Sequence, residues 1–212
     1  MNPVRLCLVR HGETAWNAER RIQGQLDVPL SPRGEAQARA TAERLAGEGA
    51  AAVYASDLSR ARDTAAHAAR RLGLAVRTRA GLRERHFGLL QSLTFAEFAR
   101  RDPAAHARYR AREEGFALPG GGESLRQFAG RVHDCLDAIV AAHPGELVLV
   151  FTHGGVLDIL QRRASGLPLY RPRDFDIPNC GLNWLQVVGG RWSLRRWAEC
   201  DHLAAALDEL PG

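Results

Sequence analysis

Short apolar runs alternate with amphipathic stretches through the first eighty residues of the chain. Residues 4–9, 51–55 and 75–77 are apolar runs of strand length and predict three β-strands. Residues 32–46 and 57–72, which lie between them, have the residue pattern of helices. Because the order is strand–helix–strand–helix–strand, it predicts a parallel sheet with helices on both faces and right-handed crossovers.

Capping residues indicate where these two helices begin and end. Ser31 and Pro32 suit the N-cap and the first helical position of the first helix. Ser56 and Asp57 offer side-chain oxygens, which predict that they form the N-cap of the second helix. Gly73 follows the last apolar position of that helix and predicts its end.

The second half of the chain continues the pattern and ends in a hairpin. Residues 123–142 predict a long amphipathic helix, residues 146–151 the clearest central strand, and residues 156–163 a further helix. Residues 182–188 and 192–197 predict an antiparallel hairpin at the sheet edge, joined by a Gly-Gly pair. We expect an α/β fold with a mostly parallel central sheet flanked by helices on both faces.

Polar stretches interrupt this pattern in two places. Residues 18–30 show no clean period and predict a long loop, and loops of this length are often functional. Residues 82–92 are a second polar loop, and residues 94–112 predict one or two helices broken at Pro103. We expect residues 91–122, approximately, to form a small inserted helical lobe or lid.

Length and charge fit one soluble domain over residues 1–212, with residues 201–212 as a loose tail. The net charge is +5, and all 29 basic residues are arginine. The arginines are spread along the chain rather than gathered in a stripe, so nucleic-acid binding is not expected. Most should lie on solvated faces, but a few could bind an anionic substrate, because the guanidinium fork fits phosphate.

Cysteine spacing and hydropathy bear on the location of the protein. The four cysteines lie far apart without a CxxC pair and are expected to be small buried residues. The N-terminus lacks the pattern of a signal peptide, and no apolar run approaches membrane-spanning length. We therefore expect a cytoplasmic protein without a membrane partner. The cysteines are Cys7, Cys135, Cys180 and Cys200.

Two apolar strands each end in a histidine followed by glycine, namely His11-Gly12 and His153-Gly154. Because the carboxyl ends of parallel strands share one edge of a sheet, the two histidines are expected to face each other there. A single histidine at a strand end is usually structural, but two in the same context favour a functional site. Zinc bound by His11, His153 and Glu84 is a weaker alternative, because zinc needs three or four convergent ligands.

Four segments, in order, resemble the histidine phosphatase superfamily, also called the phosphoglycerate mutase-like family. They are Leu8-Val9-Arg10-His11-Gly12-Glu13-Thr14 with Trp16-Asn17, Ser56-Asp57-Leu58-Ser59-Arg60-Ala61-Arg62-Asp63-Thr64-Ala65, Leu82-Arg83-Glu84-Arg85-His86-Phe87-Gly88, and Thr152-His153-Gly154-Gly155. The resemblance implies that His11 is a nucleophile that forms phosphohistidine and that Glu84 protonates the leaving alcohol. It implies that Arg10, Arg60 and His153 hold the phosphoryl oxygens, and it implies no metal and no cofactor.

The resemblance also implies substrate contacts, and phosphoryl chemistry constrains the side chains. Asn17, Gln23, Gly24 and Gly154 match positions near the phosphate or the substrate. A phosphoryl group in transit needs in-line positioning and dispersed positive charge. His11 must be neutral at its attacking nitrogen, and Glu84 must be protonated part of the time.

Helical geometry separates two candidate arginines. Arg60 and Arg62 point roughly 200° apart on a helix, so only one of them can enter a pocket. Arg60 is nearer the helix start and matches the motif, so we assign it to the site and Arg62 to a surface pair. A similar ambiguity stands between Arg83 and Arg85, which flank Glu84.

The loops favour a phosphatase over a mutase. The lobe is short and ends in Pro119-Gly120-Gly121-Gly122-Glu123-Ser124, which resembles the phosphatase branches of the family. His153 is followed by Gly154-Gly155-Val156, whereas glycolytic mutases typically place asparagine two positions after this histidine. The expected activity is hydrolysis of a small phosphorylated metabolite. Mutase-type transfer between hydroxyls is the alternative, and a non-catalytic phospho-ligand-binding module is the weaker one.

Two further features bear on partners. Arginines of the lobe could meet a second phosphate of the substrate, although a solvated face is the favoured interpretation. The carboxyl-terminal hairpin would offer an edge for a homodimer. The lobe arginines are Arg100, Arg101, Arg108, Arg110 and Arg112.

Overall fold

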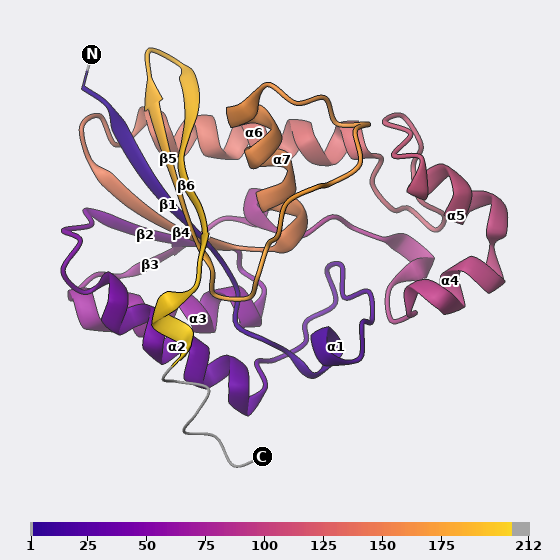
Figure 1. Ribbon diagram of the computed structural model, residues 1–212, viewed down its shortest axis with the longest axis horizontal. Coiled ribbons are helices and arrows are strands. Elements are labelled where there is room, and N and C mark those ends of the chain that lie inside the picture. The colour runs from indigo at the N-terminus through magenta and orange to yellow at the C-terminus, as the bar shows by residue number, and fades with distance from the viewer. Residues whose placement is uncertain (1, 205–212) are drawn as a thin grey trace.

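A six-stranded mixed sheet forms the centre of the protein (Figure 1). The structure is a computed structural model, and it describes residues 2–204. The strand order is β3-β2-β4-β1-β5-β6. The first four strands are mutually parallel, whereas β5 is antiparallel to β1, and β6 to β5, so the prediction of a mostly parallel sheet with an edge hairpin is confirmed. The strands are β1 (Val4–Arg10), β2 (Ala52–Ala55), β3 (Val76–Thr78), β4 (Leu147–Thr152), β5 (Leu182–Val188) and β6 (Arg191–Glu199).

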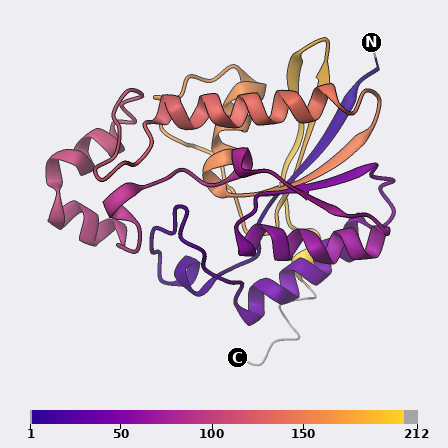
Figure 2. The same ribbon diagram turned by 180° about the vertical axis from the view of Figure 1, so that it is seen from behind.

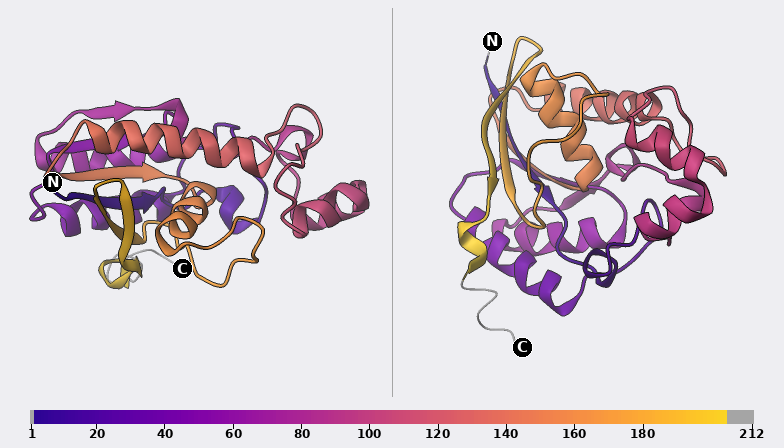
Figure 3. Two further views of the ribbon diagram at one scale, coloured as in Figure 1. Left: turned by 90° about the horizontal axis from the view of Figure 1, so that it is seen from above. Right: turned by 45° about the vertical axis from the view of Figure 1, so that its right-hand side comes forward.

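Helices cover both faces of this sheet. Leu6 and Leu8 of β1 pack on the side of α6 (Leu125–Ala141) and α7 (Gly154–Ser165). Cys7 and Val9 face the opposite side, which α2 (Pro32–Leu45) and α3 (Ser59–Leu72) cover (Figure 3). Because both faces are buried, the central strands are continuous apolar runs rather than alternating ones.

Two short helices lie beyond the carboxyl ends of β1 and β4 (Figures 1 and 2). They are α4 (Phe95–Arg101) and α5 (Pro103–Arg110), and they are separated at Pro103 as predicted. Asp102 ends the first and caps the second, because its side chain accepts a hydrogen bond from Ala105 N at 2.9 Å. Around Phe98, these helices form a small apolar cluster of their own with Leu90 and Leu118.

The predicted N-cap of α3 is wrong. Leu58 occupies the N-cap position without a side-chain cap bond. Ser56 Oγ instead accepts from the backbone of Leu58, and Asp57 is bound by Arg83 at 2.8 and 2.6 Å. Asp27 supplies the cap from the distant loop, since its Oδ1 accepts from Ser59 N at 2.7 Å. This partner cannot be seen in a local sequence window.

The start of the predicted loose tail is also ordered. Asp201–Leu203 forms a short 3-10 helix, η3, with Leu203 buried. His202 Nε2 lies 3.2 Å from Thr41 Oγ1 of α2, which fixes the segment to the body of the protein. Residues 205–212 of that prediction lie outside the described residues. No helix within residues 2–204 is long and apolar enough to cross a membrane.

Candidate active site

His11 is held at the carboxyl end of β1 in one orientation. Its backbone N–H donates to Thr152 O at 2.9 Å, and its carbonyl accepts from Asn179 Nδ2 at 2.8 Å. Ring Nδ1 lies 2.7 Å from Gly12 O. Since a carbonyl only accepts, Nδ1 carries the proton and Nε2 keeps its lone pair. His11 as a whole is 3% exposed, so its ring is a buried, oriented base or nucleophile.

His153 faces His11, as the two strand ends predict. It is the N-cap residue of α7, directly after β4, and its side chain is fully buried. The two ring centroids are 5.2 Å apart, with the planes inclined by 60°. Neither ring nitrogen of His153 has a hydrogen-bond partner within the described residues. Such buried polar atoms are costly unless something pairs with them, which points to a ligand.

Arg10 and Arg60 bring positive charge to the same place. Arg10 Nη1 donates to Ile177 O at 2.7 Å, and Arg60 donates to Leu26 O and Gly24 O at 2.8 and 2.7 Å. Their Nε atoms are buried without an acceptor within residues 2–204. Burial lowers the pKa of Arg60 to about 10, which leaves it cationic at neutral pH. The acceptors are neutral carbonyls, so both charges stay available to an anion.

The two histidines are neutral in this environment. Burial, then the charges of Arg60 and Arg10, hold the pKa of His11 well below its ordinary value. Burial and Arg60 act in the same direction on the pKa of His153. A neutral His11 meets the requirement for attack on phosphorus. A neutral His153 can donate one N–H.

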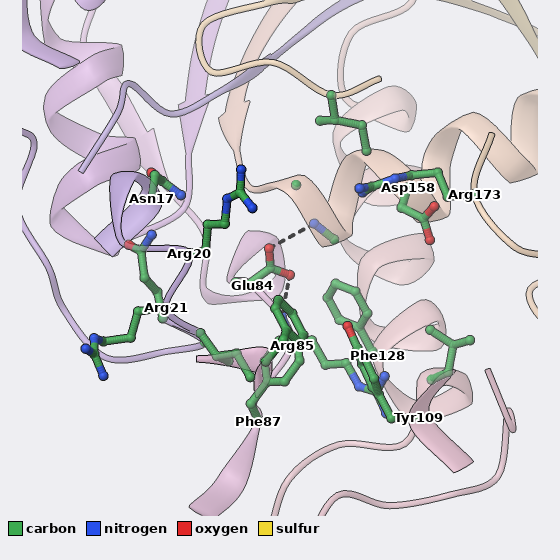
Figure 4. Close-up of a pocket in the computed structure, with 18 of the residues that line it drawn as sticks. Asn17, Arg20, Arg21, Glu84, Arg85, Phe87, Tyr109, Phe128, Asp158 and Arg173 are labelled. Carbon is green, nitrogen blue, oxygen red and sulfur yellow. Dashed lines mark hydrogen bonds between the residues drawn. The ribbon is translucent and has the colours of Figure 1, made fainter. Parts of the chain in front are cut away.

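Glu84 reaches the site from the loop after β3. Its Oε1 accepts from Arg85 N and its Oε2 from Gly155 N, each at 2.8 Å (Figure 4). The loop is fixed from two sides, because Thr152 Oγ1 donates to Leu82 O at 2.8 Å and Arg131 donates to Glu84 O at 3.2 Å. A Cβ at Gly155 would collide with Glu84 Oε1, so only glycine leaves room for the carboxyl group here.

The four predicted substrate contacts lie around the same pocket. Asn17 lines it and also accepts from Thr14 in a capping box. Gln23 is buried, with its Oε1 unpaired within the described part of the chain. Gly24 adopts a φ of +54° and presents its carbonyl to Arg60. A Cβ on Gly154 would come within 3.6 Å of Arg10 Nε.

The structure separates the two ambiguous arginine pairs. Arg60 is buried and lines the pocket, whereas Arg62 is half exposed and pairs with Asp63 at 3.0 Å. Arg83 pairs with Asp57 at the edge of the site, whereas Arg85 lines the pocket. In each pair, the position of the residue on its helix or in its loop decides which of the two side chains lines the pocket.

The pocket extends well beyond these residues. It has a volume of about 730 Å³ and reaches from His11 to α5 and to the loop before β5. Sequence reasoning did not identify Asn179, which binds the backbone of His11, or Asp158 and Arg173, which line the pocket. Residues 166–181 have no periodic pattern, so only the spacing to β5 would have hinted that this loop returns to the site. Within residues 2–204, no group of three metal-ligating side chains occurs.

Comparisons with known proteins agree with this geometry. A model of the histidine phosphatase superfamily (branch 1) matches residues 6–200. Two Arabidopsis thaliana proteins, phosphoglycerate mutase-like protein 4 and a metal-independent phosphoserine phosphatase, are 41% and 40% identical over 93% and 94% of this chain and 86% and 83% of their own. The structure of mycobacterial glucosyl-3-phosphoglycerate phosphatase has a TM-score of 0.84 and 34% identity over 94% of this chain and 100% of its own. The chain belongs to the histidine phosphatase superfamily.

Proposed function

We propose that this protein hydrolyses the phosphomonoester of a small metabolite through a phosphohistidine formed on His11. One observation carries the proposal. The neutral ring of His11, with Nε2 unprotonated, shares a buried site with unpaired donors of Arg10, Arg60 and His153. A tetrahedral dianion placed there would satisfy these donors and meet the nucleophile at once.

The proposed reaction has two steps. The lone pair of His11 Nε2 attacks phosphorus, the bond to the leaving oxygen breaks, and Glu84 gives that oxygen a proton. Water then attacks the phosphohistidine, Glu84 takes its proton, and the phosphorus–nitrogen bond breaks to release inorganic phosphate. Arg10, Arg60 and His153 hold the equatorial oxygens in both steps.

Substrate contacts and setting complete the proposal. Asn17, Gln23, Gly24 and Gly154 contact the phosphoryl group or its alcohol, and no cofactor takes part. Residues 91–122 act as a lid within one domain. The protein works in the cytoplasm, which the four unpaired cysteines of the described chain support. A homodimer through the β6 edge stays a prediction.

Hydrolysis is favoured over transfer between hydroxyls. The names of two relatives support hydrolysis: one is a metal-independent phosphoserine phosphatase, and the other is a glucosyl-3-phosphoglycerate phosphatase. To distinguish the two activities, the protein is incubated with 3-phosphoglycerate and a trace of 2,3-bisphosphoglycerate, and the products are measured. We expect inorganic phosphate or no reaction, whereas rapid conversion to 2-phosphoglycerate would favour the mutase.

The basic activity is tested with p-nitrophenyl phosphate. We expect turnover by the wild-type protein and none by H11A, with the circular dichroism spectrum unchanged. Turnover retained by H11A would overturn the proposed mechanism.

A further inference from the structure

The glycine-rich segment before α6, residues 119–124, lies outside the phosphoryl site, because none of its residues lines the pocket. Ser124 caps α6, since its Oγ accepts from the backbone of that helix at 3.2 Å. Glu123 instead faces the loop that carries Glu84. Its Oε2 accepts from His86 N at 2.8 Å, and its own N–H donates to His86 O at 2.9 Å. The segment is therefore joined to the loop of the proposed proton donor.

Arg131 of α6 connects Glu123 to the same loop. Its Nε and Nη2 each donate to one carboxylate oxygen of Glu123 at 2.8 Å, in a bidentate ion pair. Its guanidinium also donates to three backbone carbonyls, those of Gly81 at 3.0 Å, Arg83 at 3.0 Å and Glu84 at 3.2 Å. All five N–H donors of the fork are thus used, three of them on the loop, and a lysine ammonium has only three donors in total.

The ion pair is charged and shielded from water. The side chains of Arg131 and Glu123 are 24% and 19% exposed. Burial raises the pKa of Glu123, but hydrogen bonds from Arg131 and from the backbone of His86 outweigh burial and hold this pKa below its ordinary value. Loss of either member would leave the other charge without its partner in a largely buried place.

Close packing of the loop on α6 makes this geometry possible. A Cβ at Gly81 would collide with the side chain of Cys135, so glycine lets the loop approach the helix. Arg131 Cζ lies 5.2 Å from the ring centroid of Phe128, and Phe128 lines the pocket. Arg131 does not line the pocket, so it acts on the reaction only through the residues that it holds.

We propose that Arg131, paired with Glu123, is a positioning residue for the proton donor: it fixes the backbone of residues 81–84 so that the carboxyl group of Glu84 stays at the leaving oxygen. This inference rests on the proposed hydrolase function. Release of the loop would weaken the hydrogen bonds that Glu84 accepts from Arg85 N and Gly155 N, and the acid would move. Small displacements of a catalytic group are costly in rate.

A double-mutant cycle on p-nitrophenyl phosphate separates positioning from general structural damage. R131Q should lower kcat/KM about tenfold in the wild-type protein, because a displaced acid protonates the leaving oxygen less well. p-Nitrophenolate needs a proton less than other alcohols do, so E84Q should keep a measurable rate. In the E84Q background, R131Q should change kcat/KM by less than about twofold, since the group that it positions is already gone. An equal loss in both backgrounds would overturn the inference.

The leaving group supplies a second readout. Phenyl phosphate has the same ring but a poorer leaving group, so its hydrolysis depends more on Glu84. R131Q should lower kcat/KM for phenyl phosphate about tenfold more than for p-nitrophenyl phosphate. The matched control is R126Q on the same helix, where the side chain is 76% exposed and lies outside the pocket, and it should leave both values unchanged. The same factor of loss for both substrates in R131Q would contradict a role through the proton donor.

Two milder variants keep the test valid if R131Q does not fold. R131K keeps the charge with fewer donors, so it should lose less than R131Q, and E123Q should lower the ratio of phenyl to p-nitrophenyl kcat/KM in the same direction. Folded R131K and E123Q proteins with the wild-type ratio would overturn the inference while leaving hydrolysis intact. Failure of folded wild-type protein to hydrolyse any phosphomonoester would instead refute the proposed function itself.

Discussion

Gly155 and Glu84 meet from different segments of the fold, and the contact leaves no space for a side chain on the glycine. Gly155 N donates to Glu84 Oε2 at 2.8 Å at the start of α7, and a Cβ would collide with Glu84 Oε1. The absence of a side chain at this position therefore sets the position of the proposed proton donor. The contact can be tested by adding a methyl group at residue 155, which leaves every polar and charged side chain of the site in place.

We expect G155A to lower kcat/KM about a hundredfold, because it displaces Glu84 from the leaving oxygen. The matched control is G130A, on the exposed face of α6, where a Cβ meets nothing within 4 Å. G130A should keep full activity and gain about 0.5–1 kcal/mol of unfolding free energy. The measurements are steady-state kinetics on p-nitrophenyl phosphate and urea unfolding. Activity of G155A within threefold of wild type would contradict this role of the glycine.

Arg60 and Arg62 give a second matched pair on one helix. Arg60→Lys keeps the charge but loses the fork that binds Gly24 O and Leu26 O, so kcat should fall about a hundredfold or more. Arg62→Lys changes only an exposed pair with Asp63 and should leave kcat unchanged. Equal kinetics of the two variants would show that Arg60 does not hold the phosphoryl group.

Stability should depend on pH through His11 and His153. Their folded pKa values lie well below the unfolded value of about 6.5, so the unfolded chain binds more protons below that pH. The contribution of these two histidines to the unfolding free energy has its full value above about pH 6.5. Below that pH the unfolding free energy falls by about 1.4 kcal/mol per pH unit for each of them. Urea unfolding between pH 5 and 8 measures this slope. His11→Gln should flatten it, and an unchanged slope in that variant would contradict a neutral, buried His11.

Arg112 fixes the α5 segment to the body of the protein. Its side chain donates to Leu169 O and to Asp158 Oδ2, both at 2.6 Å, and Asp158 also binds Arg162 at 3.2 Å. Arg112→Ala should cost about 1.5–3 kcal/mol of unfolding free energy and raise KM, because the outer wall of the pocket loses its anchor. The exposed control Arg108→Ala, which loses the pair with Glu113, should leave the unfolding free energy nearly unchanged. Equal costs would mean that Arg112 is not an anchor.

Much of the architecture follows from local pattern. The strand ends at His11 and His153, the break at Pro103 and the Gly-Gly hairpin are all visible as periodicity and turn chemistry, and the structure has them as predicted. The juxtaposition of the two histidines follows from parallel pairing of β1 with β4. Local rules suffice for the strand ends, the break and the hairpin, because each of these depends on residues close in sequence. The pairing of β1 with β4 is long-range, and the shared edge of parallel strands makes it predictable.

Other features depend on residues far apart in the chain. Asp27 caps α3 across the fold, although Ser56 and Asp57 are the obvious local candidates. Asn179 and Arg173 come from a loop without periodicity, so their place beside the pocket depends on how β5 pairs with β1. Such tertiary contacts leave no signal in hydrophobic spacing.

The central claim is that the phosphoryl group passes through His11, and rapid-quench labelling tests it most directly. Wild-type protein is mixed with ³²P-labelled phosphomonoester, quenched in alkali within the first turnover, digested and mapped by mass spectrometry. We expect an acid-labile, alkali-stable label on the peptide containing His11, absent from a folded H11A protein. Label on any other residue, or label that persists in H11A, would contradict the account.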